Sequence, residues 1–265
     1  MTPEQIACEQ HFVKHTIQQP DGRFEVRLPL KTEATELGFS RRMAENRFLA
    51  IERRLHKDLA LKEQYCKFMQ DYESSGHMEA VPPPTDDKTV CYYLPHHPVF
   101  KSTSTTTKKR VVFDGSAKTT SGMALNDILQ TGPTIQEDLY SLVLRFRTHV
   151  ICFTADIEQM YRQISMNPQD RNLQRIIWRQ SPDQHIQEYC LKTVTYGTTS
   201  APFLAIRCLK KLAEDNMVAH PKAVSVLLND FYVDDLLSGA STIQEAIEIQ
   251  ELTTLLASAG FPLRK

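Results

Sequence analysis

Two adjacent aspartates, Asp234 and Asp235, interrupt an otherwise apolar and aromatic run that extends from Leu228 to Ser238. The composition of this run predicts a buried strand or a hairpin. Two like charges a few ångströms apart repel by about 4 kcal/mol at an effective dielectric constant of ~20. A bound divalent cation would offset that repulsion if a rigid strand presents both carboxylates. The alternative is a type I′ hairpin with acidic turn residues, which water would solvate.

A third carboxylate, Asp156, lies near the end of a second apolar segment, residues 150–157. Tyr161 follows in a segment whose pattern predicts a short helix. A site with two metal ions about 3.5–4 Å apart needs roughly three carboxylates delivered from different strands. The sequence therefore predicts that Asp156 meets the tandem acids around a pair of cations.

The bulk composition narrows the class of protein. The 265 residues carry a formal net charge of −1, which excludes a globally basic nucleic-acid binder but allows a local basic patch beside an acidic site. The six cysteines form no CxxC pair, so we expect reduced thiols and an intracellular protein. No signal peptide and no apolar run of ~20 residues is evident, so we expect a soluble protein without a membrane partner.

Hydrophobic periodicity predicts an α+β fold in which an antiparallel sheet is backed by helices. Ser40 is the predicted N-cap of the first long helical stretch, and Thr134 that of a later helix. The expected helices are residues 41–75, 135–147, 200–217 and 242–259. The expected strands are residues 91–100, 110–113, 150–157, 175–179, 186–194 and a strand pair over 229–238. Trp178, the only tryptophan, is predicted to pack the hairpin of residues 175–194.

Several segments in a fixed order resemble a known family. FTADIEQMY (residues 153–161) and FYVDD (residues 231–235) resemble the A and C motifs of reverse transcriptases. The chain as a whole resembles the polymerase region of BEL/Pao-type LTR retrotransposons. The similarity extends through YYLPHHPVFK, KKRVVFDGSAKT, LNDILQTGP, TVTYGTTSAPFLAIRCL and GFPLRK.

The resemblance implies the fingers and palm of a right-hand polymerase, with the thumb absent. Residues 1–79 would form an N-terminal helical extension, and residues 80–265 the reverse transcriptase region. The fingers would comprise residues 80–133 and 164–195. The palm would comprise residues 134–163 and 196–265.

The implied activity is RNA-directed and DNA-directed DNA synthesis, in which two metal ions assist nucleotidyl transfer from a dNTP to a primer 3′-hydroxyl. By the resemblance, Asp156 and Asp234 would ligate both metals, and Asp235 would be the less critical third carboxylate. The main-chain carbonyl of Ile157 would help to hold the nucleotide-bound metal. The implied cofactor is Mg²⁺, as two ions, with Mn²⁺ as a possible substitute.

Basic residues of the fingers are the implied triphosphate ligands. Arg110 and Asp114 match the segment whose arginine grips the incoming nucleotide, and bidentate guanidinium–phosphate geometry is the physical reason for an arginine there. Lys101, Lys108 and Lys109 are candidates for a second phosphate contact. The alternative for these three lysines is a solvated basic loop.

Two tyrosines and a B motif complete the implied substrate site. Tyr161 matches the steric gate, where an aromatic ring crowds a ribose 2′-hydroxyl; the alternative is an ordinary core tyrosine. Tyr196, Gly197 and Pro202 fall in the B motif, where glycine allows close backbone approach to the nascent base pair or template. Retroviral relatives carry glutamine in place of Tyr196, so that side-chain hydrogen bond is not carried over. Tyr232 is expected near the primer terminus.

Lys265, the last residue, matches the lysine of motif D, a proposed acid for the pyrophosphate leaving group. The implied partners are an RNA or DNA template with its primer, dNTPs, and the remainder of a polyprotein with thumb, RNase H and integrase. The expected location is the cytoplasm, inside a virus-like particle, or the nucleus.

Two other functions stay open at this point. A truncated or domesticated, catalytically incompetent remnant would bind nucleic acid or merely survive as a fold. A polymerase without a thumb should bind primer–template poorly, because the thumb supplies much of the contact with the duplex backbone. A two-metal nuclease or phosphatase would need a further carboxylate or histidine in the pocket, and nothing in the sequence demands one. An open reading frame continuing into a thumb and RNase H would favour the polymerase.

Overall fold

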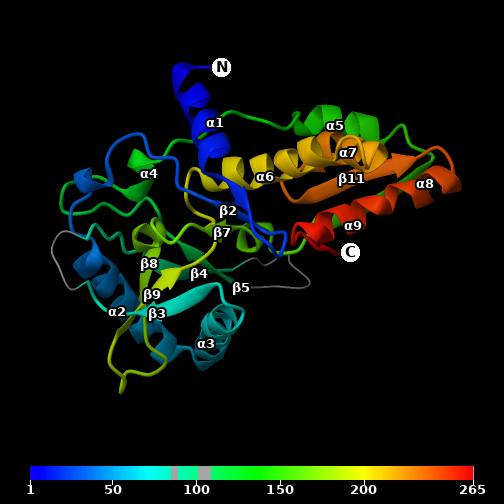
Figure 1. The fold of residues 1–265 in the computed structure, drawn as a ribbon. Coiled ribbons are helices and arrows are strands. Elements are labelled where there is room, and N and C mark those ends of the chain that lie inside the picture. Colours follow the sequence, from blue (N-terminus) through cyan, green and yellow to red (C-terminus); the bar gives the residue numbers. More distant parts are fainter. Residues whose placement is uncertain (85–88, 101–108, 265) are drawn as a thin grey trace. The chain divides into compact units, whose positions relative to one another are not determined.

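The computed structural model describes residues 1–84, 89–100 and 109–264 (Figure 1). The fold is mixed α+β, as predicted, and separates into two compact units. Unit 1 comprises residues 1–26, 131–165 and 202–265, and unit 2 comprises residues 27–130 and 166–201. The predicted N-terminal extension, residues 1–79, is divided between the two units. Among the described residues, no helix is both long and apolar enough to span a bilayer.

Unit 1 is built on an antiparallel sheet with the strand order β10-β11-β6-β12. The strands are β10 (Phe231–Tyr232), β11 (Asp235–Ala240), β6 (Ile151–Ile157) and β12 (Leu263–Arg264). The register places Ala240 opposite Ile151 at one end of the β11–β6 pair and Asp235 opposite Asp156 at the other. We call residues 231–240 the carboxylate hairpin.

Helices cover this sheet. They are α5 (Leu139–Phe146), α7 (Pro221–Asn229), α8 (Ile243–Ile249) and α9 (Glu251–Ser258). Helix α5 contacts β10 and β11, and α7 contacts β10, α8 and α9. Fully or nearly fully buried side chains of α7 and α9, including Ala223, Leu227 and Leu256, form the apolar core between these helices. Their burial provides the main driving force for holding the carboxylate hairpin on its support.

The remaining elements of unit 1 are α1 (Pro3–His15), β1 (Ile17–Gln18), β2 (Phe24–Val26), the 3₁₀ turn η2 (Met160–Gln163) and α6 (Ala201–Asn216). Helix α1 packs on α6 through an edge-to-face contact of Phe12 with Phe203, whose ring centroids are 6.1 Å apart. Arg207 of α6 pairs with Glu9 at 2.7 Å and lies over the Phe12 ring. The short strand β7 (Ser165–Met166) lies where the chain passes from unit 1 to unit 2.

Unit 2 contains a three-stranded antiparallel sheet and a separate two-stranded one. The first has the order β3-β9-β8, with β3 (Met78–Val81), β9 (Gln187–Leu191) and β8 (Arg175–Trp178); the second pairs β4 (His96–Phe100) with β5 (Lys109–Phe113). The helical elements are η1 (Ala34–Glu36), α2 (Arg41–Lys57), α3 (Leu59–Ser74), α4 (Leu125–Ile128) and η3 (Arg171–Gln174).

An aromatic cluster forms the centre of unit 2. The Trp178 ring centroid lies 5.4 Å from that of Tyr65 and 5.7 Å from that of Phe48, so this tryptophan packs the β8–β9 hairpin, as predicted, against α2 and α3. His96 is buried in the same cluster, where its Nε2 donates to the carbonyl of Ile177 at 2.8 Å and its Nδ1 accepts from the Tyr65 hydroxyl. Burial lowers the pKa of His96 to about 4.

Several predicted helix boundaries are wrong, and capping explains most of them. The long stretch after Ser40 breaks into α2 and α3 at Asp58, whose carboxylate accepts from the Leu61 amide at 2.9 Å. Ser40 is the N-cap position, but its hydroxyl accepts from the amide of Tyr93 instead of capping α2. The helix predicted from residue 135 begins only at Leu139.

Asp138, not Thr134, caps that helix, because its carboxylate accepts from the Ser141 amide at 3.0 Å. The predicted helix over 242–259 is interrupted at Gln250, where α8 ends and α9 begins. The strand pair predicted over 229–238 is β10 and β11, and the apolar residues before Asn229 belong to α7. Sequence pattern located the elements well and their ends poorly.

Candidate functional site

The sheet of unit 1 brings two carboxylates from distant parts of the sequence together. Asp156 on β6 and Asp235 on β11 are direct partners in the antiparallel register. Side chains at such positions point to the same face of the sheet, with Cβ atoms about 4.5–5.5 Å apart. Asp156 is half-buried and Asp235 is exposed. Two like charges in this arrangement destabilise the sheet unless a cation lies between or beside them. On the other side of Asp156 the register sets Arg264 of β12, whose guanidinium is paired with Glu158 at 3.4 Å.

The turn of the carboxylate hairpin holds the third acid. Tyr232 pairs with Asp235, which leaves Val233 and Asp234 as a two-residue turn. Val233 has φ +57°, whereas Asp234 does not have a positive φ. A positive φ at the first central residue alone is the type II′ pattern, so the turn differs from the type I′ alternative. Glycine usually occupies this position; a β-branched residue there is a backbone outlier that costs on the order of 1–3 kcal/mol.

Two hydrogen bonds fix this strained turn. The Val233 amide donates to Oε1 of Gln136 at 2.7 Å. The Ile157 amide donates to the main-chain carbonyl of Asp234 at 2.9 Å. The second bond ties the backbone of Asp234 to the residue that follows Asp156. The turn therefore holds one defined position at the end of β6.

A half-buried ion pair anchors the base of the carboxylate hairpin. Asp230, immediately before β10, accepts from the Ser238 hydroxyl at 2.6 Å and from Nε of Arg145 at 3.2 Å. Arg145 also donates to the main-chain carbonyl of Asn229 and pairs with Glu137 at 2.9 Å. These bonds, first that to Glu137 and then that to Asp230, raise the pKa of Arg145. Helix α5 thus clamps the hairpin at its base, while Gln136 holds its tip.

Tyr161 lies near the same acids. It follows Gln159, which has φ +52° and turns the chain from β6 into η2. The Tyr161 side chain is half-buried. Its pKa is raised, first by burial and then by the negative charge of Asp234. The Tyr161 phenol is therefore near enough to Asp234 for the charge of that carboxylate to oppose ionisation of the phenol.

The donor set of this site suits a hard cation, although it is not a closed ligand cluster. Carboxylate and main-chain carbonyl oxygens are the ligands that Mg²⁺ and Mn²⁺ prefer. Among the described residues, however, no three His, Cys, Asp or Glu side chains converge on a common ion position. Asp156, Asp234 and Asp235 thus supply suitable oxygens from adjacent backbone positions, and some of their side chains would have to reorient to share an ion.

Two of the B motif residues, Tyr196 and Gly197, lie in unit 2. The Tyr196 hydroxyl donates to the carbonyl of Val111, and its ring centroid lies 5.7 Å from that of Phe113. Gly197 has φ +99°, and a Cβ at this position would lie 2.1 Å from the carbonyl oxygen of Phe113. No other residue fits there without moving the backbone. Asn126 donates to the carbonyl of Gly197 at 3.0 Å, which fixes the motif beside β5.

The remaining predicted residues have separate environments. Arg110 is exposed on β5 opposite Val99, whereas Asp114 pairs with Arg47 at 2.6 Å. The carboxylate of Asp114 is therefore already engaged within unit 2. Pro202 lies in the first turn of α6, and Tyr232 is 38% exposed beside the turn of the carboxylate hairpin. Lys101, Lys108 and Lys265 lie outside the described residues.

The predicted residues thus divide between the units. Unit 1 holds Asp156, Ile157, Tyr161, Pro202, Tyr232, Asp234 and Asp235; unit 2 holds Arg110, Asp114, Tyr196 and Gly197. Sequence reasoning missed the residues that support the carboxylate hairpin, namely Gln136, Arg145, Asp230 and Val233. Their only sequence signal was the position of Asp230, a charged residue next to the apolar pair Phe231-Tyr232.

No protein-family model matches the chain, and a search of curated proteins found no match.

Proposed function

We propose that this chain is the fingers and palm of a template-directed DNA polymerase of the reverse transcriptase type. The observation that carries the proposal is the register of β6 and β11, which sets Asp156 opposite Asp235 and ties Asp234 to Ile157. Acids from two distant segments meet at one end of a sheet, as two-metal chemistry requires. The substrates would be dNTPs and a primer annealed to an RNA or DNA template.

Asp156, Asp234 and Asp235 would hold the divalent ions, with the carbonyl of Ile157 as a further donor. Bound Mg²⁺, or Mn²⁺ in its place, would supply charge neutralisation at the triphosphate and lower the pKa of the primer 3′-hydroxyl. The carboxylates set where that hydroxyl and the α-phosphate meet. The backbone bond from Ile157 to Asp234 keeps the two donor strands at a constant spacing.

Other residues would select and orient the nucleotide. Tyr161 would exclude a ribose 2′-hydroxyl, because the resemblance sets it at the steric gate and its half-buried ring is near enough to Asp234 for that charge to raise its pKa. Arg110 would bind the triphosphate through its guanidinium, whose exposure leaves it accessible to phosphate. Gly197 would allow the template or the base pair to approach the backbone, and Tyr232 would contact the primer terminus.

A second candidate is a catalytically incompetent remnant that still binds nucleic acid. One observation favours it: within the described part of the chain, no three metal-ligating side chains converge on one point. Such a protein would keep the register of β6 and β11 as a fold feature and would bind primer–template independently of divalent ions.

Primer extension separates the two candidates. The chain would be assayed with Mg²⁺, dNTPs and a primed RNA or DNA template. Asp156→Asn and Asp234→Asn should abolish extension, and Tyr161→Ala should admit ribonucleotides. Asp215→Asn is the matched control, because Asp215 pairs with Lys211 on the exposed side of α6. Undiminished extension by Asp234→Asn would refute the polymerase proposal.

A further inference from the structure

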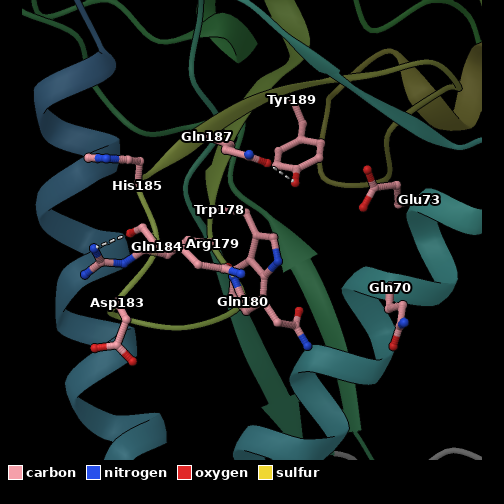
Figure 2. Close-up of a pocket in the computed structure, with 10 residues that line it drawn as sticks. All are labelled: Gln70, Glu73, Trp178, Arg179, Gln180, Asp183, Gln184, His185, Gln187 and Tyr189. Carbon is pink, nitrogen blue, oxygen red and sulfur yellow. Dashed lines mark hydrogen bonds between the residues drawn. The ribbon is translucent and has the colours of Figure 1, made fainter.

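Unit 2 carries a groove of about 660 Å³ between α3 and the β8–β9 hairpin (Figure 2). Its volume lies within the range of ligand-binding pockets. None of the residues predicted for metal, nucleotide or primer binding lines it. The groove is therefore separate from the residues of the proposed polymerase site, and its ligand has to be inferred from its own lining.

The floor of the groove contains an unused hydrogen-bond donor. Trp178 is 4% exposed and Tyr189 is 6% exposed, so both rings form the floor rather than the rim. The Tyr189 hydroxyl donates to Oε1 of Gln187 at 2.8 Å. The indole N–H of Trp178, in contrast, has no hydrogen-bond partner within the described parts of the chain, and Figure 2 shows it on the side of the ring that faces Gln70 of α3. An indole N–H can only donate, so a ligand in the groove should present an acceptor to it.

The charge of the groove is negative. Arg179 is the one formal cation of its lining, and its charge is engaged by two bonds of 2.7 Å to the carboxylate of Glu52. The lining acids Glu73 and Asp183 are exposed, and neither forms an ion pair with any described residue. Glu73 contributes, after burial, to the raised pKa of Tyr189, which places its carboxylate close to the floor. A cationic ligand would be attracted here and a phosphate backbone repelled.

Two amide side chains from different elements complete the groove. Gln70 projects from α3 and Gln180 from the turn after β8 (Figure 2). Their side-chain amides have no hydrogen-bond partner among the residues that the structure describes. Each amide offers both donors and an acceptor, which is the complement of a peptide group.

We propose that this groove binds an extended peptide segment of a partner protein that carries lysine or arginine. A carbonyl of the peptide accepts from the Trp178 indole N–H, and the amides of Gln70 and Gln180 bond its peptide groups. Glu73 pairs with the cationic side chain. This interaction is independent of polymerase activity, so either function can fail without the other.

The single tryptophan makes the test direct, because all tryptophan fluorescence of the chain comes from Trp178, which lines this groove. The full chain would be titrated with a blocked octapeptide of alternating lysine and serine, with its glutamate–serine counterpart, and with a DNA dodecamer. The lysine peptide alone should change the Trp178 emission in a saturable manner, and added salt should weaken the effect. No change with the lysine peptide, or an equal change with the glutamate peptide, would overturn the proposal. A response to DNA alone would assign the groove to nucleic acid and overturn it as well.

Two substitutions of neighbouring acids on α3 sharpen the result. Glu73→Gln removes one of the two negative charges of the groove and should weaken binding of the lysine peptide by about two- to five-fold. Asp71→Asn removes an equal charge two residues away, about 200° around the helix, and should leave binding unchanged. Both residues are exposed, so thermal melting should be unaffected by either change. Equal affinity of wild type and Glu73→Gln would contradict the assignment of Glu73.

Discussion

The two units differ in the partners of their acidic side chains. In unit 2, Glu188 is buried but accepts from Arg41 at 2.7 Å, from Arg175 at 2.9 Å and from the Tyr93 hydroxyl at 2.5 Å. Burial alone would raise the pKa of Glu188, and these bonds together lower it. In unit 1, Asp156 faces Asp235 across the sheet on a hairpin whose turn is strained. A compensated buried charge is a structural feature, whereas repelling charges beside strained backbone indicate a functional site.

The largest expected effect is in the compensated cluster. Glu188→Gln should lower the free energy of unfolding by about 3–5 kcal/mol, because it leaves the buried Arg175 without its counterion. Urea denaturation measures this loss. Glu45→Gln is the control, since Glu45 pairs with the same Arg41 at the surface, and it should cost less than about 1 kcal/mol. Similar costs for the two variants would remove the contrast between the units.

Acidification should weaken unit 2 through His96. The pKa of this imidazole is about 4 in the folded protein and about 6.5 when unfolded, so only the unfolded state takes up the proton between these values. The stabilisation is complete above pH ~6.5, falls as the pH drops towards 4 and is lost below that. Its total size is on the order of 3 kcal/mol. Unfolding followed at pH 7 and pH 5 should show the decrease in wild type and a smaller one in His96→Gln.

The tip of the carboxylate hairpin should depend on one acceptor. Gln136→Met keeps the side-chain length but removes the partner of the Val233 amide, at a cost of about 1–3 kcal/mol. Gln136→Glu retains an oxygen at this position and should preserve most of the stability. Hydrogen exchange at Val233 should accelerate in the Met variant alone. Slow exchange in both variants would show that Gln136 does not hold the turn.

The smallest effect should come from removing the backbone strain at Val233 in the turn. Val233→Gly loses a half-buried side chain but gains a residue suited to φ +57°, so the net change in unfolding free energy should stay below about 1 kcal/mol. Val224→Gly, in the buried face of α7, is the comparison and should cost about 3 kcal/mol or more. A large loss in Val233→Gly would mean that the valine conformation is not strained.

The sequence predicted those elements that a local pattern defines. The apolar run that became β6 and the turn signal between β8 and β9 led to correct strands. The breaks at Asp58 and Gln250 were not predicted, because the apolar periodicity continues across both positions and the interruption depends on capping and packing.

The residues of the candidate site also fall into two groups, those that the sequence predicted and those that it did not. The acids and Tyr161 carry strong motif signals, so they were named from sequence. Gln136 and Arg145 were not, because each bonds a main-chain atom of a segment far along the chain. A hydrogen bond to backbone places no demand on the identity of the partner residue, and so leaves no paired signal in the sequence.

Titration of Mn²⁺ into the full chain tests the central claim most directly. If Asp156, Asp234 and Asp235 share cations, wild type and the Asp215→Asn control should bind Mn²⁺ with the same saturable isotherm. Asp156→Asn should then bind at least about ten-fold more weakly, because it removes a ligand from the shared site. Equal Mn²⁺ binding by Asp156→Asn and wild type, or no binding by wild type, would contradict a metal site between β6 and the carboxylate hairpin.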